Sequence, residues 1–230
     1  MMPGSAAVAV WCDVGFEVKD EFDDWHAHEH MPERLSIPGC LRGSRWVSTD
    51  GRNAYFTLYE AKDLATITTG PYLERLNNPT PWSTKMMPHH RNMVRSLCRV
   101  QAGFGSCVAQ FLLTLRLTPE PGAEEKLGNC LTAELLAKIP SRKGLVSAQL
   151  LQDAARPQGT LTTEQKIRGG DATADWIVLV NGYDAAAVDA VAADEVNAGA
   201  LAAHGAAPGS IARVYRLAIV LTPGDLQGIA

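Results

Sequence analysis

The chain lacks an excess of charge and any long apolar run. Its 230 residues carry 21 Lys and Arg against 25 Asp and Glu, a formal net charge of −4. This balance offers no positive surface for a nucleic acid or an anionic membrane. No run approaches the ~18 consecutive apolar residues of a membrane-spanning helix. The N-terminus lacks the basic segment of a secretory signal peptide. We therefore expect no nucleic-acid partner and no membrane association.

Cysteine pairs and nucleotide-binding motifs are also missing. The five cysteines form no C-x-x-C pair and no even disulfide framework, which is typical of reduced thiols in a cytoplasmic protein. The sequence has no G-x-G-x-x-G after a predicted strand, no P-loop and no G-x-S-x-G. These absences predict a cytoplasmic globular protein that uses no nucleotide cofactor.

The sequence contains the same order of elements twice. Hydrophobic spacing and turn signals predict strand, helix, strand, strand, helix and strand in the first half, over residues 6–14, 21–37, 41–49, 54–60, 63–76 and 97–104, with a further helical piece over 83–96. The second half repeats the order over residues 108–117, 124–139, 145–151, 176–182, 185–204 and 211–221. Ile37-Pro38 aligns with Ile139-Pro140, and the same offset aligns the first strands of both halves. The repeat indicates an internal duplication.

Each repeat predicts one ferredoxin-like unit. A βαββαβ unit makes a four-stranded antiparallel sheet with both helices on one face, which leaves the other face bare. A second copy can cover that face. The expected fold is therefore α+β, with two tandem ferredoxin-like units packed sheet to sheet as an intramolecular dimeric α/β barrel. Residues 1–105 would form the unit that carries the site, and residues 106–230 the second unit.

Two segments of the first half resemble a known superfamily. Residues 25–39 read W-H-A-H-E-H-M-P-E-R-L-S-I-P-G, and residues 79–82 read P-T-P-W. They are similar to segments of the dimeric α/β-barrel superfamily, which includes EthD-like proteins, antibiotic-biosynthesis monooxygenases, muconolactone isomerases and polyketide cyclases. The match is best to members with a W-x-x-x-E-H-M-P-E-R segment. The resemblance covers the second half only by its order of elements, and it implies the fold more than the reaction.

The predicted helix over residues 21–37 concentrates titratable side chains. At 100° per residue, His26, Glu29 and His30 lie on the arc that also carries Phe22 and Trp25. Imidazoles and a carboxylate held against apolar surface can have pKa values suited to acid–base catalysis. The expected catalytic residues are His30 as base or acid, with Glu29 or His26 orienting it. An exposed polar face or an internal ion pair is the structural alternative.

The remaining residues of this helix are expected elsewhere. The same projection places His28 and Arg34 on other faces, although Pro32 removes a helix N–H and makes the later angles less certain. The pattern H-x-x-E-H over 26–30 matches a metallopeptidase motif, and the two outer histidines with Glu33 could bind one divalent ion. No further ligand cluster stands out, so we expect no metal. His89 and His90 are expected at the surface.

Four residues are candidates for contact with a substrate: Trp25, Arg45, Tyr59 and Trp82. Arg42 and Arg45 could meet an anionic substrate or be solvated edge charges. Tyr59 alternates with its neighbours along a strand, and one strand face must line the barrel interior. Trp82 lies in a proline-rich loop and could cover a ligand or anchor packing.

The second half lacks this polar set. At the offset of the repeat, the positions of His26, His28, Glu29 and His30 are taken by Gly128, Cys130, Leu131 and Thr132. The predicted site therefore occurs once per chain, and the second unit would close the barrel and shape the pocket.

Three functions remain open. The first is a cofactor-independent enzyme that moves a proton on a small aromatic or polyketide-like molecule, as an isomerase, cyclase, lyase or monooxygenase. The second is a non-catalytic small-ligand-binding or stress-related barrel. The third is haem handling, with His30 or His89 as the iron ligand. Pairing of two fused chains as a homodimer also stays open.

Overall fold

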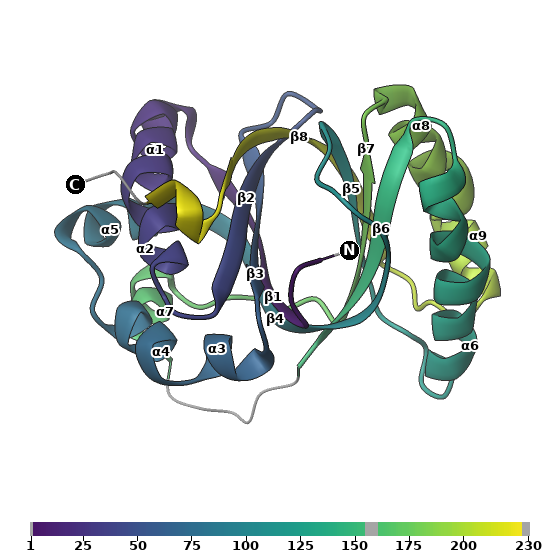
Figure 1. The fold of residues 1–230 in the computed structure, drawn as a ribbon, viewed down its shortest axis with the longest axis horizontal. Helices are drawn as coiled ribbons and strands as arrows, with labels where there is room; N and C mark the ends of the chain where they lie inside the picture. Colours follow the sequence, from purple (N-terminus) through teal and green to yellow (C-terminus); the bar gives the residue numbers. More distant parts are fainter. Residues whose placement is uncertain (1, 155–160, 227–230) are drawn as a thin grey trace.

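The computed structural model describes residues 2–154 and 161–226, and its centre is a closed eight-stranded barrel (Figure 1). The strands of the first half are β1 (Ala6–Val14), β2 (Cys40–Ser48), β3 (Ala54–Ala61) and β4 (His90–Gly105). Those of the second half are β5 (Phe111–Leu117), β6 (Leu145–Asp153), β7 (Trp176–Gly182) and β8 (Ile211–Leu221).

The strand order identifies two ferredoxin-like sheets joined at two seams. Around the barrel the order is β4-β1-β3-β2-β8-β5-β7-β6, and each neighbouring pair is antiparallel. Strand β2 pairs with β8, and β4 pairs with β6, so each half supplies four adjacent strands. Closure leaves no unpaired sheet edge. The predicted α+β fold, a fused dimeric α/β barrel, is confirmed.

The helices cover the outer faces of the two sheets at opposite ends of the molecule (Figure 1). On the first half they are η1 (Phe16–Val18), α1 (Lys19–Trp25), η2 (His26–His30), α2 (Met31–Leu35), α3 (Leu64–Thr68), α4 (Gly70–Asn77), α5 (Pro81–Met86) and η3 (Met87–His89). On the second half they are α6 (Glu124–Asn129), η4 (Cys130–Leu135), η5 (Leu136–Ser141), α8 (Ala185–Ala190), η6 (Val191–Glu195) and α9 (Ala198–Ala203), and η7 (Pro223–Leu226) follows β8. None of the helices among the described residues is both long and apolar enough to cross a bilayer.

Local signals set the ends of several helices. The backbone turns at Gly39 with a φ of 95°, which glycine adopts without strain, and β2 follows directly. The side chains of Asp63 and Thr80 accept backbone N–H groups at the starts of α3 and α5. The expected helix over 83–96 is wrong in its second part. Strand β4 begins at His90, because its first residues pair with β1, and this long-range pairing overrides local helical spacing.

One helix of the second half lies on the first half. The connection between β6 and β7 contains α7 (Thr163–Arg168), which packs against α4 and η3 (Figure 1). A capping box between Thr162 and Gln165 starts this helix, and Gly169 ends it with a φ of 86°. The segment has no counterpart in the first half, and the sequence patterns do not predict it.

The barrel interior contains an apolar cluster, and the side chains of each strand alternate between the interior and the helix side of the sheet. Ala7, Ala9 and Trp11 of β1 and Phe56 of β3 pack with Trp46 and other residues inside the barrel. The opposite face of β3, which carries Tyr59, points to the helices of the first half. The structure thus shows which strand face lines the barrel interior and which faces the helices.

Candidate functional site

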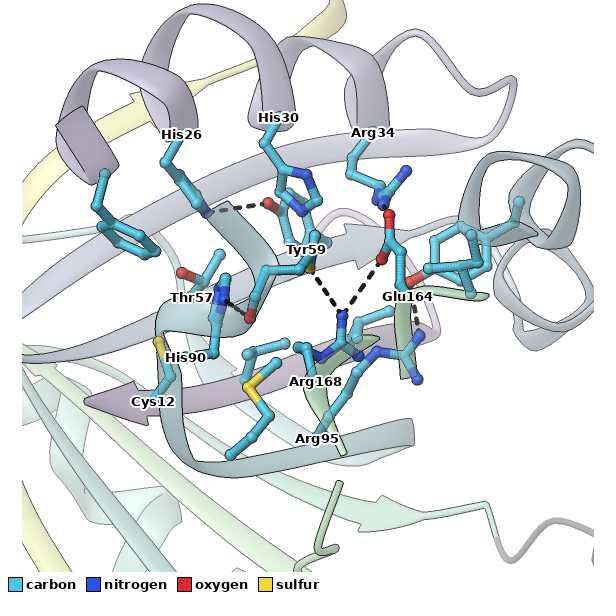
Figure 2. A pocket seen from close by; sticks show the side chains of 17 residues that line it. Cys12, His26, His30, Arg34, Thr57, Tyr59, His90, Arg95, Glu164 and Arg168 are labelled. Atoms are coloured by element: carbon cyan, nitrogen blue, oxygen red, sulfur yellow. Dashed lines mark hydrogen bonds and ion pairs between the residues drawn. The ribbon is translucent and has the colours of Figure 1, made fainter. Parts of the chain in front are cut away.

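The polar residues of the first half surround a small cavity between the helices and the outer face of the sheet (Figure 2). Its volume is about 40 Å³, room for about three water molecules. Because the cavity lies on the helix side of the sheet, the site is outside the barrel interior. Its polar lining residues are Cys12, His26, His30, Arg34, Thr57, Tyr59, Tyr72, His90, Arg95, Glu164 and Arg168.

A π-helical turn brings three of these residues onto one helix face. The segment α1–η2–α2 is continuous, and η2 has the wider i→i+5 hydrogen bonding over His26–His30. The extra residue per turn aligns His26, His30 and Arg34 above the sheet (Figure 2). The expectation that Arg34 lies on another face is wrong, because a uniform 100° step ignores this turn. The second half has a π-helical segment at the same place, η4, without the polar residues.

His26 is held against the sheet by a tyrosine. It is 4% exposed, and its Nε2 lies 3.3 Å from the hydroxyl oxygen of Tyr59 on β3. Its Nδ1 is buried without a hydrogen-bond partner among the described residues. Burial, and next the positive charge of Arg45, lower the pKa of His26 well below its usual value. The ring is therefore neutral at pH 7.

His30 is the least constrained imidazole in the cavity. It is 9% exposed and packs on the Trp25 ring, with the ring centroids 4.5 Å apart. Within the described part of the chain, its buried Nδ1 has no hydrogen-bond partner. Burial, followed by the positive charge of Arg34, lowers its pKa well below the usual value. His30 is therefore a neutral imidazole at pH 7, and its Nδ1 can still pair with a bound molecule.

A third histidine lies in the cavity against expectation. His90 stands at the start of β4, with its Nδ1 3.1 Å from the carbonyl oxygen of Met87. Its ring meets the ring of Phe22 edge-on, and burial lowers its pKa to about 4. The predicted surface position is wrong for His90, because the strand starts there and turns the ring inward. His28 is exposed, as expected.

A charged network closes one end of the cavity, beyond His30 (Figure 2). Arg34 forms an ion pair with Glu164 of α7, and both side chains are 3% exposed. Arg168, one turn later on α7, lies 3.4 Å from Glu164 and 2.9 Å from Asp171. The second half of the chain thus contributes charged groups to the site on the first half.

Arg95 is a buried cation that hydrogen-bonds to a tyrosine. It is 4% exposed, and it donates a 2.9 Å hydrogen bond to the hydroxyl oxygen of Tyr72 on α4. Its guanidinium also lies over the Tyr72 ring, 5.9 Å from the centroid. Glu164 and Asp171 act on Arg95 only at longer range.

The predicted site residues fall into two groups. His26, His30 and Tyr59 line the cavity. Trp25 packs against the His30 ring and donates a 3.2 Å hydrogen bond to the hydroxyl of Ser83. Glu29, by contrast, does not line the cavity: it accepts hydrogen bonds from Thr80 at 2.5 Å and Ser83 at 3.4 Å.

Two predicted substrate contacts are engaged elsewhere. Arg45 binds Asp23, through its backbone carbonyl at 3.0 Å and its carboxylate at 3.3 Å. Trp82 donates to Glu21 at 3.2 Å and packs on an apolar cluster, the anchoring role that the sequence left open. Arg42 faces the barrel side and forms a two-bond pair with Glu60.

The residues missed by sequence analysis are mainly the charged ones. Arg34 stands within the motif segment, so its presence there was a usable signal. Glu164 and Arg168 lie in the insertion of the second half, whose extra length was the one available sign. Nothing local marks Arg95 or Tyr72, because only the folded chain brings them near the histidines.

The described residues fit neither a metal ion nor a haem at this cavity. No group of three or more His, Cys, Asp or Glu among them is placed to hold a metal ion. Glu33, the third ligand considered, pairs instead with Arg34 at 3.3 Å and Arg75 at 3.7 Å. A cavity of about 40 Å³ is smaller than the ~150 Å³ that takes up benzene, and a haem is several times larger.

Solved structures share this architecture at low sequence identity. No protein-family model and no curated protein sequence matches the chain. An anthrone oxidase-like protein has a TM-score of 0.65 and 11% identity over 96% of this chain and 94% of that one.

A proposed monooxygenase from Fusobacterium nucleatum subsp. nucleatum has a TM-score of 0.62 and 10% identity over 96% of both chains. A proposed chlorite dismutase has a TM-score of 0.52 and 11% identity over 98% of this chain and 99% of that one. At such identities the likeness establishes the fold. The chain therefore has the ferredoxin-like, dimeric α/β-barrel fold of these proteins, with both units joined in one polypeptide.

Proposed function

We propose that this chain is an acid–base enzyme that removes a proton from carbon in a small carbonyl-containing molecule, with His30 as the base. The carrying observation is a neutral, buried imidazole whose Nδ1 has no hydrogen-bond partner in the described part of the chain, beside the guanidinium of Arg34. A buried polar atom left unpaired costs free energy, so a bound molecule that pairs with it is favoured.

The chemistry needs no cofactor for its first step. His30 takes the proton from a carbon next to the carbonyl, and the C–H electron pair moves onto the carbonyl oxygen as an enolate. The positive charge of Arg34 stabilises that oxygen. Return of the proton from the imidazolium to the same or another carbon completes an exchange or an isomerisation. His26, held by Tyr59, keeps a second neutral imidazole beside the reacting group.

The size of the cavity limits the molecule that fits. At about 40 Å³ the space holds a few non-hydrogen atoms, whereas benzene occupies a cavity of ~150 Å³. A small carbonyl compound fits this structure best. An aromatic or polyketide-like substrate remains part of the proposal only if the cavity wall moves outward on binding.

The names of the similar structures are compatible with this proposal, but they do not serve as evidence for it. An oxidase-like protein and proposed monooxygenases share the fold. Removal of a proton to give a carbanion or enolate is also the first step of cofactor-free oxygenation, so one site could serve either outcome.

Proton exchange with deuterium oxide tests the proposal. Pyruvate and acetone, an anionic and a neutral C–H acid of small size, are incubated with the protein in D₂O and followed by proton NMR. We expect the protein to accelerate exchange of at least one compound. His30→Gln should reduce the acceleration by about 10²- to 10⁴-fold, the usual contribution of a general base.

His28→Gln is the matched control, because His28 lies exposed on the same helical segment. It should exchange at the wild-type rate. If neither compound exchanges faster than in buffer, or if His30→Gln is as active as the wild type, His30 is not a catalytic base. The non-catalytic binding protein would then be the better description.

A further inference from the structure

The charges around the cavity are unevenly paired. Three guanidinium groups line it, those of Arg34, Arg95 and Arg168. The carboxylates of Glu33, Glu164 and Asp171 form ion pairs with Arg34 and Arg168. The three lining histidines are neutral, since each has a lowered pKa. One positive charge, on Arg95, is left without a carboxylate in ion-pair contact among the described residues.

Burial makes the isolated charge of Arg95 informative. An arginine cannot lose its proton inside a protein. Taking its charge out of water is costly unless an anion lies close to it. Arg95 is 4% exposed, and a neutral phenol is its hydrogen-bond partner. A bound anion would give Arg95 a counter-charge in direct contact.

Tyr72 supports the same interpretation. Its hydroxyl oxygen accepts the hydrogen bond from Arg95, and this leaves the hydroxyl proton available for donation. Tyr72 lines the cavity together with Arg95. A carboxylate placed there would accept from both groups, and charge-assisted hydrogen bonds of this kind are the stronger ones.

We propose that Arg95 and Tyr72 form a carboxylate subsite, so that the molecule handled by His30 is a small organic acid bound as its anion. The inference deepens the proposed function and rests on it for the role of His30. In Figure 2 the helix carries His26, His30 and Arg34 on one side of the cavity, while Arg95 rises from the strand side. A short oxo acid spans this arrangement, with its carboxylate at Arg95 and its reacting carbon at His30.

Acetate and acetamide provide the test, because they have the same shape and differ in charge. Binding is followed at constant ionic strength by the NMR shifts of the His26 and His30 imidazole nitrogens. We expect acetate to move these resonances and acetamide to bind about tenfold more weakly or not at all, because hydrogen bonds to a charged group are stronger than those to a neutral one. Equal binding of both probes overturns the proposal.

Variants locate the binding in the cavity. Arg95→Gln should weaken acetate binding about tenfold or more, and Tyr72→Phe should weaken it several-fold. Arg99→Gln is the matched control: Arg99 lies exposed on the same strand, so the variant should bind acetate like the wild type. Unchanged acetate binding by Arg95→Gln rejects the subsite.

The stability of the variant separates a binding role from a structural one. Because no carboxylate among the described residues is in ion-pair contact with Arg95, Arg95→Gln without acetate should unfold at the same temperature as the wild type or higher. If the variant instead unfolds at a clearly lower temperature and Tyr72→Phe binds acetate normally, Arg95 is a packing residue. Acetate binding is measured without any reaction, so this result stands apart from the deuterium exchange.

Discussion

At the scale of single residues, burial of neutral imidazoles is the feature that sets the chemistry of the cavity. His26, His30 and His90 each have a pKa below the usual value, and the main cause is burial. Neutral rings can accept protons at pH 7, which a base requires, while nearby arginines discourage premature protonation. The same property must affect the pH dependence of stability.

We expect the free energy of unfolding to fall as the pH drops below about 6.5. An unfolded histidine takes up a proton near that pH, whereas the folded rings stay neutral to lower pH, so the unfolded state binds more protons. Each such histidine contributes a loss of about 1.4 kcal/mol per pH unit. For His90 the loss levels off below its folded pKa of about 4.

Urea unfolding between pH 7 and about pH 5 measures this effect. His30→Gln should show a shallower fall than the wild type, by about 1.4 kcal/mol per pH unit at the acid end of this range. His28→Gln should keep the wild-type slope, because His28 is exposed in the folded chain. Identical slopes for all three proteins would show that His30 titrates normally.

At the scale of elements, α7 is the part that completes the site. It belongs to the second half, yet it docks on α4 and η3 and its Glu164 binds two arginines. Ion pairs lie at the centre of this contact, and the side chains that form them are almost fully buried. Stability and site geometry are therefore coupled through one short helix.

Glu164→Gln should destabilise the chain by about 3 kcal/mol, because it leaves buried arginines short of a counter-ion. Chemical denaturation measures the loss. Lys166→Gln, at an exposed position of the same helix, should change stability little. Adding Arg34→Met to Glu164→Gln should restore part of the loss, since it removes the buried charge of Arg34 that has lost one of its two carboxylate partners. A cost for Glu164→Gln no larger than for Lys166→Gln would mean that α7 is held by other contacts.

In the molecule as a whole, the closed barrel connects the two halves through interior contacts and strand pairing. Trp11 of β1 donates to the hydroxyl of Thr114 on β5 at 3.1 Å, and Leu112 of β5 packs in the same interior cluster as Phe56. The two seams between the sheets add continuous backbone pairing. Separate unfolding of one half would expose the apolar face of the other.

We therefore expect one cooperative unfolding transition. Leu112→Ala should lower the global stability by about 2–5 kcal/mol, through a cavity in the barrel interior. Amide hydrogen exchange should show β1 and β5 losing protection by the same factor. Loss of protection in β5 alone would show that the halves open independently.

Much of the architecture could be predicted because its signals are local. Alternating strands, the repeated element order, Pro38-Gly39 and the capping residue Asp63 are all short-range features. They predict the duplicated βαββαβ units and hence the barrel. The apolar anchors Phe22 and Trp25 similarly predict that His26 and His30 are buried on one helix.

Local sequence patterns thus sufficed to predict the fold class, the duplication and the histidine pair. The position of the cavity outside the barrel, the contact of Glu29 with Thr80, and the approach of Arg95 and α7 to the histidines emerge only in the folded chain. These features join residues that lie far apart in the sequence. Helix and strand periodicity act over a few residues, whereas the site's charges come from strands and helices that meet only when the barrel closes.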